Sequence, residues 1–328
     1  MPKKQQPKLW FSLPLILLMI FVLAGAGFLS LSGPADKTMV ETQRFVIPKG
    51  QAVSIIADRL EEAGLVRNSL VFRLIVKSEG VGSSIQAGSF DLSPSMSAKE
   101  IAQQLTQGTH DLWVTIPEGW RREEIAQSIA DQQLEVFDED EFLTLTRGKE
   151  GRLFPDTYLV PRQISTAQVV EMLEQTFERK VIEGLEAEIT ASTHDFDEAL
   201  IMASIVERES RGYEEMRMVA GVLWNRVEIG MALNADATLQ YIKGYSSVED
   251  SWWVVPTAAD KQLTSAYNTY RYAGLPPTPI ANPGVNAIKA ALNPASTDYF
   301  YYLHDRAGNI HFARTLEEHN ANVVEYLR

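Results

Sequence analysis

The sequence contains no cysteine among its 328 residues. Disulfides, zinc sites built from thiolates and thiol nucleophiles are therefore excluded. Its five histidines do not form the His-Glu-x-x-His pattern of zinc proteases, and the chain lacks a glycine-rich phosphate loop of either common type. We therefore expect a protein that works without a metal and without a cofactor.

Positive charge is also scarce, because 30 Lys and Arg stand against 43 Asp and Glu, giving a net charge of −13. Nucleic-acid binding needs clustered basic residues, so we expect no nucleic-acid partner. Substrates with few negative charges, such as glycans, remain open. Hydrophobic residues at 45% and charged residues at 22% are typical of a globular protein with a proper core.

The N-terminal part carries one long apolar run, residues 9–31, interrupted only by two serines and Pro14. At about 1.5 Å per residue such a helix reaches roughly 34 Å, enough for a hydrocarbon core of about 30 Å. Lysines precede the run, and the positive-inside rule then predicts a cytoplasmic tail at 1–8 and a transmembrane helix at 9–31. The alternative is a signal peptide cleaved after 24–26, but signal cores are usually about 7–15 residues long.

The sequence therefore predicts a single-pass protein of the cell (inner) membrane, with its N-terminus in the cytoplasm. Everything after the span is expected on the extracytoplasmic (periplasmic) face, where ATP-dependent chemistry is excluded.

A repeat follows the span. Phe-Val-Ile-Pro-Lys-Gly at 45–50 matches Val-Thr-Ile-Pro-Glu-Gly at 114–119, and each copy continues into an Ile-Ala pair, at 56 and at 125. The offset of 69 residues is the same at every matched position. Alternation, a Pro-x-Gly turn and apolar residues at helical spacing predict a strand, a turn and an amphipathic helix in each copy.

The first unit, Thr42–Gly108, is predicted to run strand–helix–helix–strand–helix. Gly64 is expected to cap the C-terminus of the first helix, and Asn68 or Ser69 to begin the second. Ser97, with Glu100 three residues on, is expected to cap the last helix. This module resembles a LysM-like glycan-binding domain. The alternative is a spacer that only sets the height of the catalytic domain.

The fold class is therefore α+β: an N-terminal transmembrane helix, a small LysM-like α+β module, and a larger mixed α+β catalytic domain with a C-terminal β-hairpin and helix. The expected hairpin joins Asp298–His304 to Asn309–Ala313, and the final helix starts near Leu316. The expected domains are a stalk at 32–41, the LysM-like module at 42–110 and the catalytic domain at 111–328. Further helices are expected near Arg121–Gln133, Ser165–Glu183, Asp195–Arg211 and Glu214–Ile229.

One of these helices carries a candidate acid. At about 100° per residue, Leu200, Ala203 and Glu207 lie on one stripe of a helix that starts at Asp195. Glu207 ends an apolar run close to the helix C-terminus, and both burial and the helix dipole disfavour its charged form. Its pKa should therefore exceed the usual value of about 4.3. A carboxylic acid that keeps its proton near neutral pH is what cleavage of a glycosidic bond needs.

A structural alternative is an ordinary ion pair between Glu207 and Arg211, four residues further along the helix. Glu209 points about 200° away from Glu207 and is expected to be solvated.

The segment Ala203-Ser-Ile-Val-Glu207-Arg-Glu resembles the catalytic-glutamate motif of the endolytic murein transglycosylase (YceG-like) family. The resemblance implies that Glu207 is the catalytic acid/base and that the substrate is the glycan strand of peptidoglycan. Other segments resemble the same family, in the family's order: Gly151–Tyr158, Val222–Arg226, Ala266–Tyr270, Gly274–Gly284 and His319-Asn320.

The resemblance also implies a mechanism with one carboxyl group. The C6 hydroxyl of N-acetylmuramic acid attacks its own C1 and leaves a 1,6-anhydro end, so that the substrate supplies a preorganised nucleophile. One residue then protonates the leaving oxygen and accepts the hydroxyl proton. The expected role is to limit or terminate strand elongation, beside membrane-bound cell-wall synthases.

Substrate contacts are expected from residues of the family segments. One departure concerns Asp236 and Thr238, because Ala237 stands where the family is expected to have Pro before Thr. Three residues are candidate neutral donors to the substrate's N-acetyl group: Asn225, Asn268 and Tyr270. The predicted substrate-binding set is Asn225, Arg226, Asp236, Thr238, Tyr267, Asn268 and Tyr270.

Two other functions stay open. A two-carboxylate peptidoglycan hydrolase would take Asp156 or Asp236 as its second group. A non-catalytic glycan-binding scaffold of cell-wall synthesis would rely on the module at 42–110.

Overall fold

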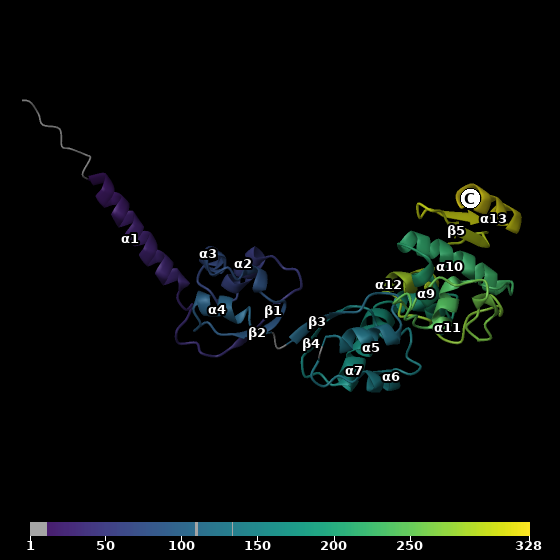
Figure 1. Cartoon of the computed structure of the whole chain (residues 1–328), viewed down its shortest axis with the longest axis horizontal. Coiled ribbons are helices and arrows are strands. Elements are labelled where there is room, and N and C mark those ends of the chain that lie inside the picture. Colours follow the sequence, from purple (N-terminus) through teal and green to yellow (C-terminus); the bar gives the residue numbers. More distant parts are fainter. Residues whose placement is uncertain (1–11, 109–110, 133) are drawn as a thin grey trace, which may run out of the picture. The chain divides into compact units, whose positions relative to one another are not determined.

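The computed structural model describes residues 12–108, 111–132 and 134–328. It is mixed α+β, with helices and three two-stranded sheets among the described residues. Two compact units form, one from Met1–Trp113 with Tyr158–Arg162 and the other from Val114–Thr157 with Gln163–Arg328 (Figure 1). The α+β class is confirmed, whereas the domain boundaries expected from the sequence stay predictions.

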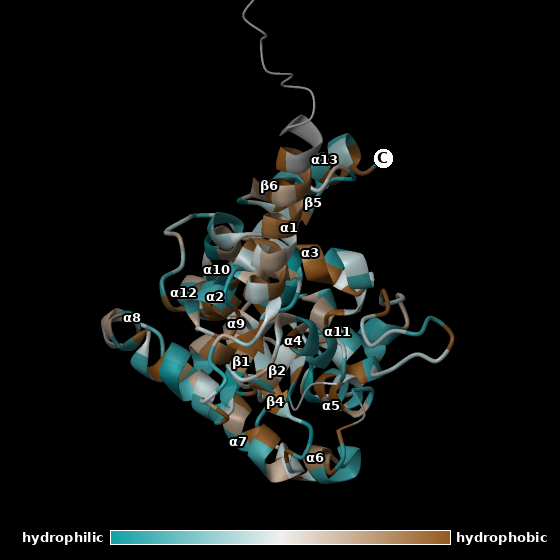
Figure 2. Ribbon diagram, turned by 90° about the vertical axis from the view of Figure 1, so that its left-hand side faces the viewer, coloured by the Kyte–Doolittle hydropathy of each residue, from teal (hydrophilic) through white to brown (hydrophobic). Residues whose placement is uncertain are grey.

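Helix α1, Ser12–Ser32, contains the described part of the apolar run. Its described apolar side chains are exposed, with 77% of Phe21 and 59% of Leu17 accessible. The ribbon of this helix carries the brown of hydrophobic residues (Figure 2). Within the described residues, no helix meets the length and apolarity required for a membrane span. The predicted span at 9–31 begins outside the described residues.

The first unit has the predicted order of elements. Strands β1 and β2 pair antiparallel, with Phe45 opposite Phe90, and both side chains are buried. Helices α2, α3 and α4 complete the core with Leu60, Phe72 and Ile101. The bounds are β1 Gln43–Ile47, α2 Val53–Glu62, α3 Ser69–Glu79, a 3₁₀ turn Gly82–Ser84, β2 Gly88–Leu92 and α4 Ala98–Gln104.

The predicted caps of this unit are confirmed. The Asn68 side chain accepts a hydrogen bond from Val71 N–H at the start of α3. Ser97 and Glu100 form a reciprocal capping box at α4. Gly64 follows the end of α2 with φ 68°, a left-handed conformation that glycine adopts without steric cost.

The 69-residue repeat is also confirmed as a structural repeat. Gly50 and Gly119 end the two Pro-x-Gly turns with the same φ of 78°. The helices that follow, α2 and α5 (Arg122–Ala130), bury matching positions of the two copies: Ile56, Ala57 and Leu60 in one, and Ile125, Ala126 and Ile129 in the other. In the second copy, strand β3 (Asp111–Thr115) pairs with β4 (Thr157–Pro161).

The second unit is built around helix α9, Phe196–Glu209. Its buried face packs against α10 (Tyr213–Glu228) and α12 (Val285–Leu292), and Trp224 Nε1 donates to Ala291 O between these two helices at 3.0 Å. The other helices are α6 Glu139–Leu145, α7 Thr166–Phe177, a π-helical turn Glu178–Glu183, α8 Glu186–Ala191, α11 Asp236–Lys243 and a 3₁₀ turn Asp260–Gln262.

The chain ends as predicted, with a hairpin and a helix. Strands β5 (Tyr301–His304) and β6 (Ile310–Ala313) pair antiparallel, and α13 (Leu316–Tyr326) packs against both. The hairpin lies beside α10 in the yellow part of the chain (Figure 1). This places the turn between β5 and β6 near the C-terminal end of α9, where both line one cavity.

Candidate active site

Helix α9 positions the predicted acid near its C-terminal end. The Asp195 carboxylate accepts two backbone N–H groups of the first turn, at 2.9 and 3.2 Å, and caps the helix. Leu200 and Ala203 are buried on the predicted stripe, and Glu207 follows them in a half-buried position. The buried stripe that the sequence predicted to lead to Glu207 is confirmed.

The Glu207 carboxyl group has a backbone partner from α12. Its Oε2 accepts a hydrogen bond from Gly284 N–H at 3.0 Å, and Gly284 is the N-cap of α12. Burial raises the pKa of Glu207, and the nearby Glu118 carboxyl raises it further, while the Gly284 N–H and the Arg208 guanidinium lower it. The net direction is upward. The protonated form is favoured, yet the carboxylate keeps partners, as an acid that later acts as a base requires.

An ion pair between Glu207 and Arg211 does not form, so that alternative interpretation of the sequence is wrong. Arg211 donates its backbone N–H to Glu215 at 2.9 Å. Its guanidinium turns toward the β5–β6 turn, where Nη1 lies 3.6 Å from the position of a Cβ built on Gly308.

Two glycines allow a second carboxyl group to approach Glu207. A Cβ on Gly284 would lie 1.8 Å from Glu118 Oε1, so the Glu118 side chain occupies the space that this glycine leaves open. A Cβ on Gly119, whose φ is 78°, would lie 3.4 Å from Glu207 Cγ. Sequence reasoning did not select Glu118, although the repeat marks its place between the proline and the glycine of the second turn.

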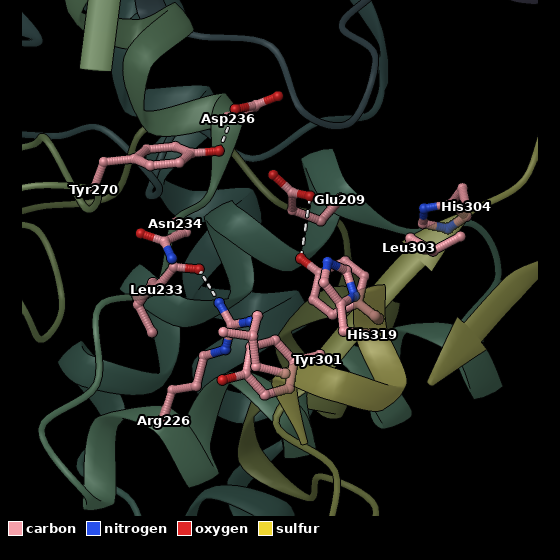
Figure 3. A pocket seen from close by; sticks show the side chains of 12 residues that line it. Glu209, Arg226, Leu233, Asn234, Asp236, Tyr270, Tyr301, Leu303, His304 and His319 are labelled. Carbon is pink, nitrogen blue, oxygen red and sulfur yellow. Dashed lines mark hydrogen bonds between the residues drawn. The ribbon is translucent and has the colours of Figure 1, made fainter. Parts of the chain in front are cut away.

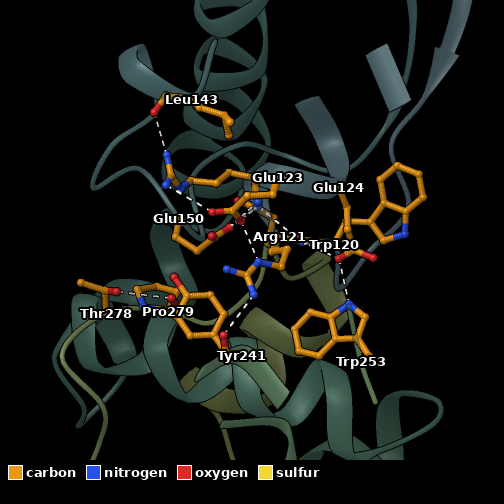
Figure 4. Close-up of polar contacts among 12 residues, drawn as sticks. Trp120, Arg121, Glu123, Glu124, Leu143, Glu150, Tyr241, Trp253, Thr278 and Pro279 are labelled. Carbon is orange, nitrogen blue, oxygen red and sulfur yellow. Dashed lines mark hydrogen bonds and ion pairs between the residues drawn. The ribbon is translucent and has the colours of Figure 1, made fainter. Parts of the chain in front are cut away.

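Arg208 lies on the other side of Glu207. Its guanidinium carbon sits 3.8 Å from the centre of the Trp253 ring, and its Nη1 donates to Gly119 O at 3.4 Å. Trp253 Nε1 in turn donates to Glu124 at 2.8 Å (Figure 4). Burial lowers the pKa of Arg208. Trp253 therefore holds the cation beside the acid.

A buried network fixes the two segments around Glu207. Glu150, 6% exposed, accepts from Arg122 N–H at 3.1 Å and from Asn282 Nδ2 at 2.8 Å (Figure 4). Asn282 also forms an antiparallel bridge with Trp120, and its carbonyl accepts the N–H of Gly119. Burial, then the charge of Glu123, raises the pKa of Glu150 to about 8. The network links the Gly119 turn to the segment that leads into Gly284.

Two cavities open at the C-terminal end of α9. One, of about 680 Å³, is lined by Glu207 to Arg211 and by the turn from His304 to Gly308. The other, of about 420 Å³, is lined by Arg226, Asp236 and Tyr270 among others (Figure 3). Glu209 and His304 line both, so the two cavities adjoin. We call them the acid cavity and the tyrosine cavity.

Glu209 is half-buried at the junction of the two cavities, so the expectation of a freely solvated side chain was wrong. The Tyr302 hydroxyl of β5 donates to its Oε2 at 3.1 Å (Figure 3). Burial raises the pKa of Glu209. The sequence could not reveal this, because β5 joins the site from a segment 93 residues away.

The tyrosine cavity brings together three of the predicted substrate-binding residues. The Tyr270 hydroxyl donates to Asp236 Oδ1 at 2.7 Å, and Arg226 donates to Leu233 O at 2.6 Å (Figure 3). Arg226 also donates to Phe300 O at 2.5 Å. Their predicted contacts with substrate stay predictions.

The other predicted residues hold loops and helices in place. Asn225 Nδ2 donates to the carbonyls of Thr297 and Tyr299, at 2.9 and 3.0 Å. Asn268, fully buried, donates to the carbonyls of two loop residues. Thr238 and Tyr267 use their hydroxyls on Thr269 and Thr278, at 2.9 and 2.6 Å. Of the three candidate neutral donors, only Tyr270 therefore lines a cavity beside Glu209.

Neither aspartate considered as a second hydrolytic carboxylate lines the acid cavity. Asp156 is paired with Lys180 at 2.6 Å. Among the described residues, no group of three or more acidic or histidine side chains is arranged to hold a metal ion.

Comparison with known proteins agrees with these features. A sequence model described as the YceG-like family matches residues 45–325. A protein of Bacillus subtilis (strain 168) named endolytic murein transglycosylase is 30% identical, with 93% of this chain and 91% of the relative covered. A protein of the same name from Streptococcus pneumoniae serotype 2 (strain D39 / NCTC 7466) is 26% identical. That match covers 90% of this chain and 60% of the relative.

A solved structure is also similar. It is the crystal structure of a yceG-like protein from Listeria monocytogenes, with a TM-score of 0.59 and 28% sequence identity. The match covers 86% of this chain and 98% of the solved one.

Proposed function

This chain belongs to the YceG-like family, and we propose from that membership and from the setting of Glu207 that it is an endolytic murein transglycosylase. It cleaves the bond between N-acetylmuramic acid and N-acetylglucosamine within peptidoglycan strands and leaves 1,6-anhydro ends. The observation that carries the proposal is one half-buried carboxyl group with a raised pKa, opening into a cavity of about 680 Å³.

Glu207 performs both proton transfers. Protonated Glu207 donates to the glycosidic oxygen as the bond from C1 to that oxygen breaks, and the C4 hydroxyl of the next sugar leaves. The C6 hydroxyl of the same muramyl residue then bonds to C1 and gives its proton to the Glu207 carboxylate. Atoms and charge balance without water, and the acid returns to its starting state.

The surroundings match these two states. Burial favours the neutral acid before cleavage. The Gly284 N–H, 3.0 Å from Oε2, and the Arg208 cation stabilise the carboxylate that exists between the two transfers. A single carboxyl group suffices because the nucleophile is part of the substrate.

The test is a digestion of purified peptidoglycan with the full chain, followed by mass analysis of the new ends. Anhydro ends that are made by the wild type and not by Glu207→Gln support the proposal. Free reducing ends in their place would establish the two-carboxylate hydrolase. Unchanged fragment release by Glu207→Gln would remove Glu207 from the chemistry.

We also propose that the chain is held at the inner membrane by residues 9–31, with the catalytic part on the extracytoplasmic face. The apolar run, the lysines before it and the exposed apolar side chains of α1 support this. Membrane fractionation of the full chain, with and without residues 1–31, tests it. Recovery of the full chain in the soluble fraction after gentle lysis contradicts anchoring.

Such an anchor would keep the enzyme close to membrane-bound synthases and to newly made strands. The proposed role is to limit or terminate strand elongation. The LysM-like module would then contact the glycan, which a binding assay with long strands can measure.

A further inference from the structure

Two guanidinium groups in the wall of the acid cavity have no acidic partner within the described part of the chain. Arg211 follows α9, and Arg306 lies in the β5–β6 turn that lines the same cavity. Among the described residues, the Arg211 guanidinium forms neither a hydrogen bond nor an ion pair, and Arg306 uses one nitrogen on Leu327 O at 3.0 Å. Both side chains are exposed to the cavity mouth and to solvent.

The Arg211 guanidinium reaches the turn that carries Arg306. The Arg211 Nη1 is 3.6 Å from the position of a Cβ built on Gly308, two residues from Arg306 in the same turn. The turn itself is fixed by Asp305, which accepts from the N–H groups of Ala307 and Asn309, both at 2.8 Å. A defined turn therefore carries Arg306 on the wall of the cavity that Arg211 also lines.

The remaining charges of the cavity are already engaged. Asp305 is used by the turn and by His311, at 3.1 Å, and Glu209 accepts from Tyr302. Arg208 is held over the Trp253 ring. Glu207 accepts from Gly284 N–H, so the two guanidinium groups of the cavity wall that neither pair with a described carboxylate nor lie over an aromatic ring are those of Arg211 and Arg306.

We propose that Arg211 and Arg306 bind a carboxylate of a peptide stem. The stem is the one on the muramyl sugar whose glycosidic bond Glu207 cleaves. The inference rests on the proposed function, since that sugar is the one whose C1 reacts. Its stem starts at the lactyl group of the sugar and carries free carboxylates. Guanidinium groups recognise carboxylates through paired, charge-assisted hydrogen bonds. The site therefore distinguishes stem-bearing strands from bare ones.

The experiment compares two substrates with the full chain: uncrosslinked strands that carry stems, and the same strands after an amidase has removed the stems. The rate of formation of anhydro ends is measured as kcat/KM for the wild type, Arg211→Ala, Arg306→Ala and Arg211→Lys. Arg147→Ala is the matched control, because Arg147 is exposed and lies outside the acid cavity.

The wild type is expected to prefer stem-bearing strands. Each alanine variant should lower kcat/KM on these strands by roughly fivefold to twentyfold, the effect of one charge-assisted hydrogen bond, and leave the rate on bare strands unchanged. Arg211→Lys should recover part of the loss, Arg147→Ala should match the wild type, and salt should reduce the preference.

Equal rates of the wild type on both substrates would overturn the inference. So would a variant that slows both substrates equally, since the anion would then lie elsewhere on the strand, for example in a phosphate at its end. A wild type that makes no anhydro ends on either substrate defeats the proposed function instead. In the Glu207→Gln background, calorimetry with a muramyl peptide measures stem binding apart from cleavage, and equal affinity with and without Arg211→Ala also overturns the inference.

Discussion

The backbone N–H of Gly284 donates to Oε2 of Glu207 at 3.0 Å, across 77 residues of sequence. The C-terminal end of α9 thus meets the N-terminal end of α12 at one carboxyl group. The two helix ends have opposite effects on a carboxylate, because the first disfavours negative charge and the second favours it. Burial decides the balance and leaves the pKa of Glu207 raised.

Replacement of the acid is the first prediction. Glu207→Gln keeps the side-chain shape and can still accept from Gly284, but it has no proton to transfer. We expect kcat to fall by about 10²–10⁴-fold or more, the usual contribution of general acid–base catalysis. The thermal unfolding midpoint should stay level or rise, since a half-buried ionisable group is removed. Release of anhydro ends measures the first effect, and calorimetry the second; a large loss of thermal stability would mean that inactivity reflects misfolding.

The second prediction concerns the pH profile. Cleavage requires protonated Glu207, so kcat/KM should fall as pH rises through its raised pKa. The Glu118 charge contributes to that upward shift. Glu118→Gln removes the charge and should move the alkaline limb to lower pH. A limb that stays in place, or moves to higher pH, would show that Glu118 does not act on the acid.

The third prediction follows from the close approach of Glu118 to Gly284. In Gly284→Ala the new Cβ would lie 1.8 Å from Glu118 Oε1, so the exposed Glu118 side chain must move away, whereas the backbone at 284, with φ −77°, accepts alanine. We expect the alkaline limb of the kcat/KM profile to move to lower pH, as in Glu118→Gln, because the displaced carboxylate raises the pKa of Glu207 less. Gly108→Ala is the control, because a Cβ there meets no atom within 4 Å. Wild-type kinetics of Gly284→Ala would contradict this account of the site.

The fourth prediction links the buried network to stability. The pKa of Glu150 is raised from 4.5 to about 8 in the folded protein, so the folded state holds a proton that the unfolded state releases between these values. The contribution of Glu150 to the free energy of unfolding should therefore be greatest below about pH 4.5. It should fall by a few kcal/mol as pH rises to about 8.

Glu150→Gln should flatten that decline, since an amide keeps the acceptor for Arg122 and Asn282 and does not ionise. Unfolding midpoints at several pH values between 5 and 9 measure the slope for wild type and variant. The exposed Glu135→Gln serves as the comparison. Parallel slopes for wild type and Glu150→Gln would refute the assignment.

The sequence predicted the helices, caps, turns and hairpin that depend on residues close together in the chain. Helix α9, its Asp195 cap and the stripe that ends at Glu207 follow from residues within a few turns of each other. The module with β1 and β2, the C-terminal hairpin and the repeated turn were found in the same way, because alternation, caps and Pro-x-Gly turns are local signals.

Long-range contacts were not predictable from these signals. Gly284, Glu118 and Tyr302 reach the end of α9 from distant segments, and nothing in their own neighbourhoods marks that meeting. Glu209 was therefore expected to face solvent, since helical phase alone cannot show that β5 covers it. Helix α12, at whose N-terminus Gly284 supplies the N–H to the acid, was also missed. It has only eight residues, mostly small or aliphatic, and so shows too little helical periodicity.

The two Pro-x-Gly turns keep one backbone and carry opposite charges between the proline and the glycine, Lys49 in the first copy and Glu118 in the second. Since the glycine φ is 78° in both, the side chain at the middle position does not set the bend. The middle position of the turn therefore accepts either charge without a change in the glycine conformation. In the second copy, a single substitution at Glu118 can therefore change the charge next to Glu207 while the turn keeps its conformation.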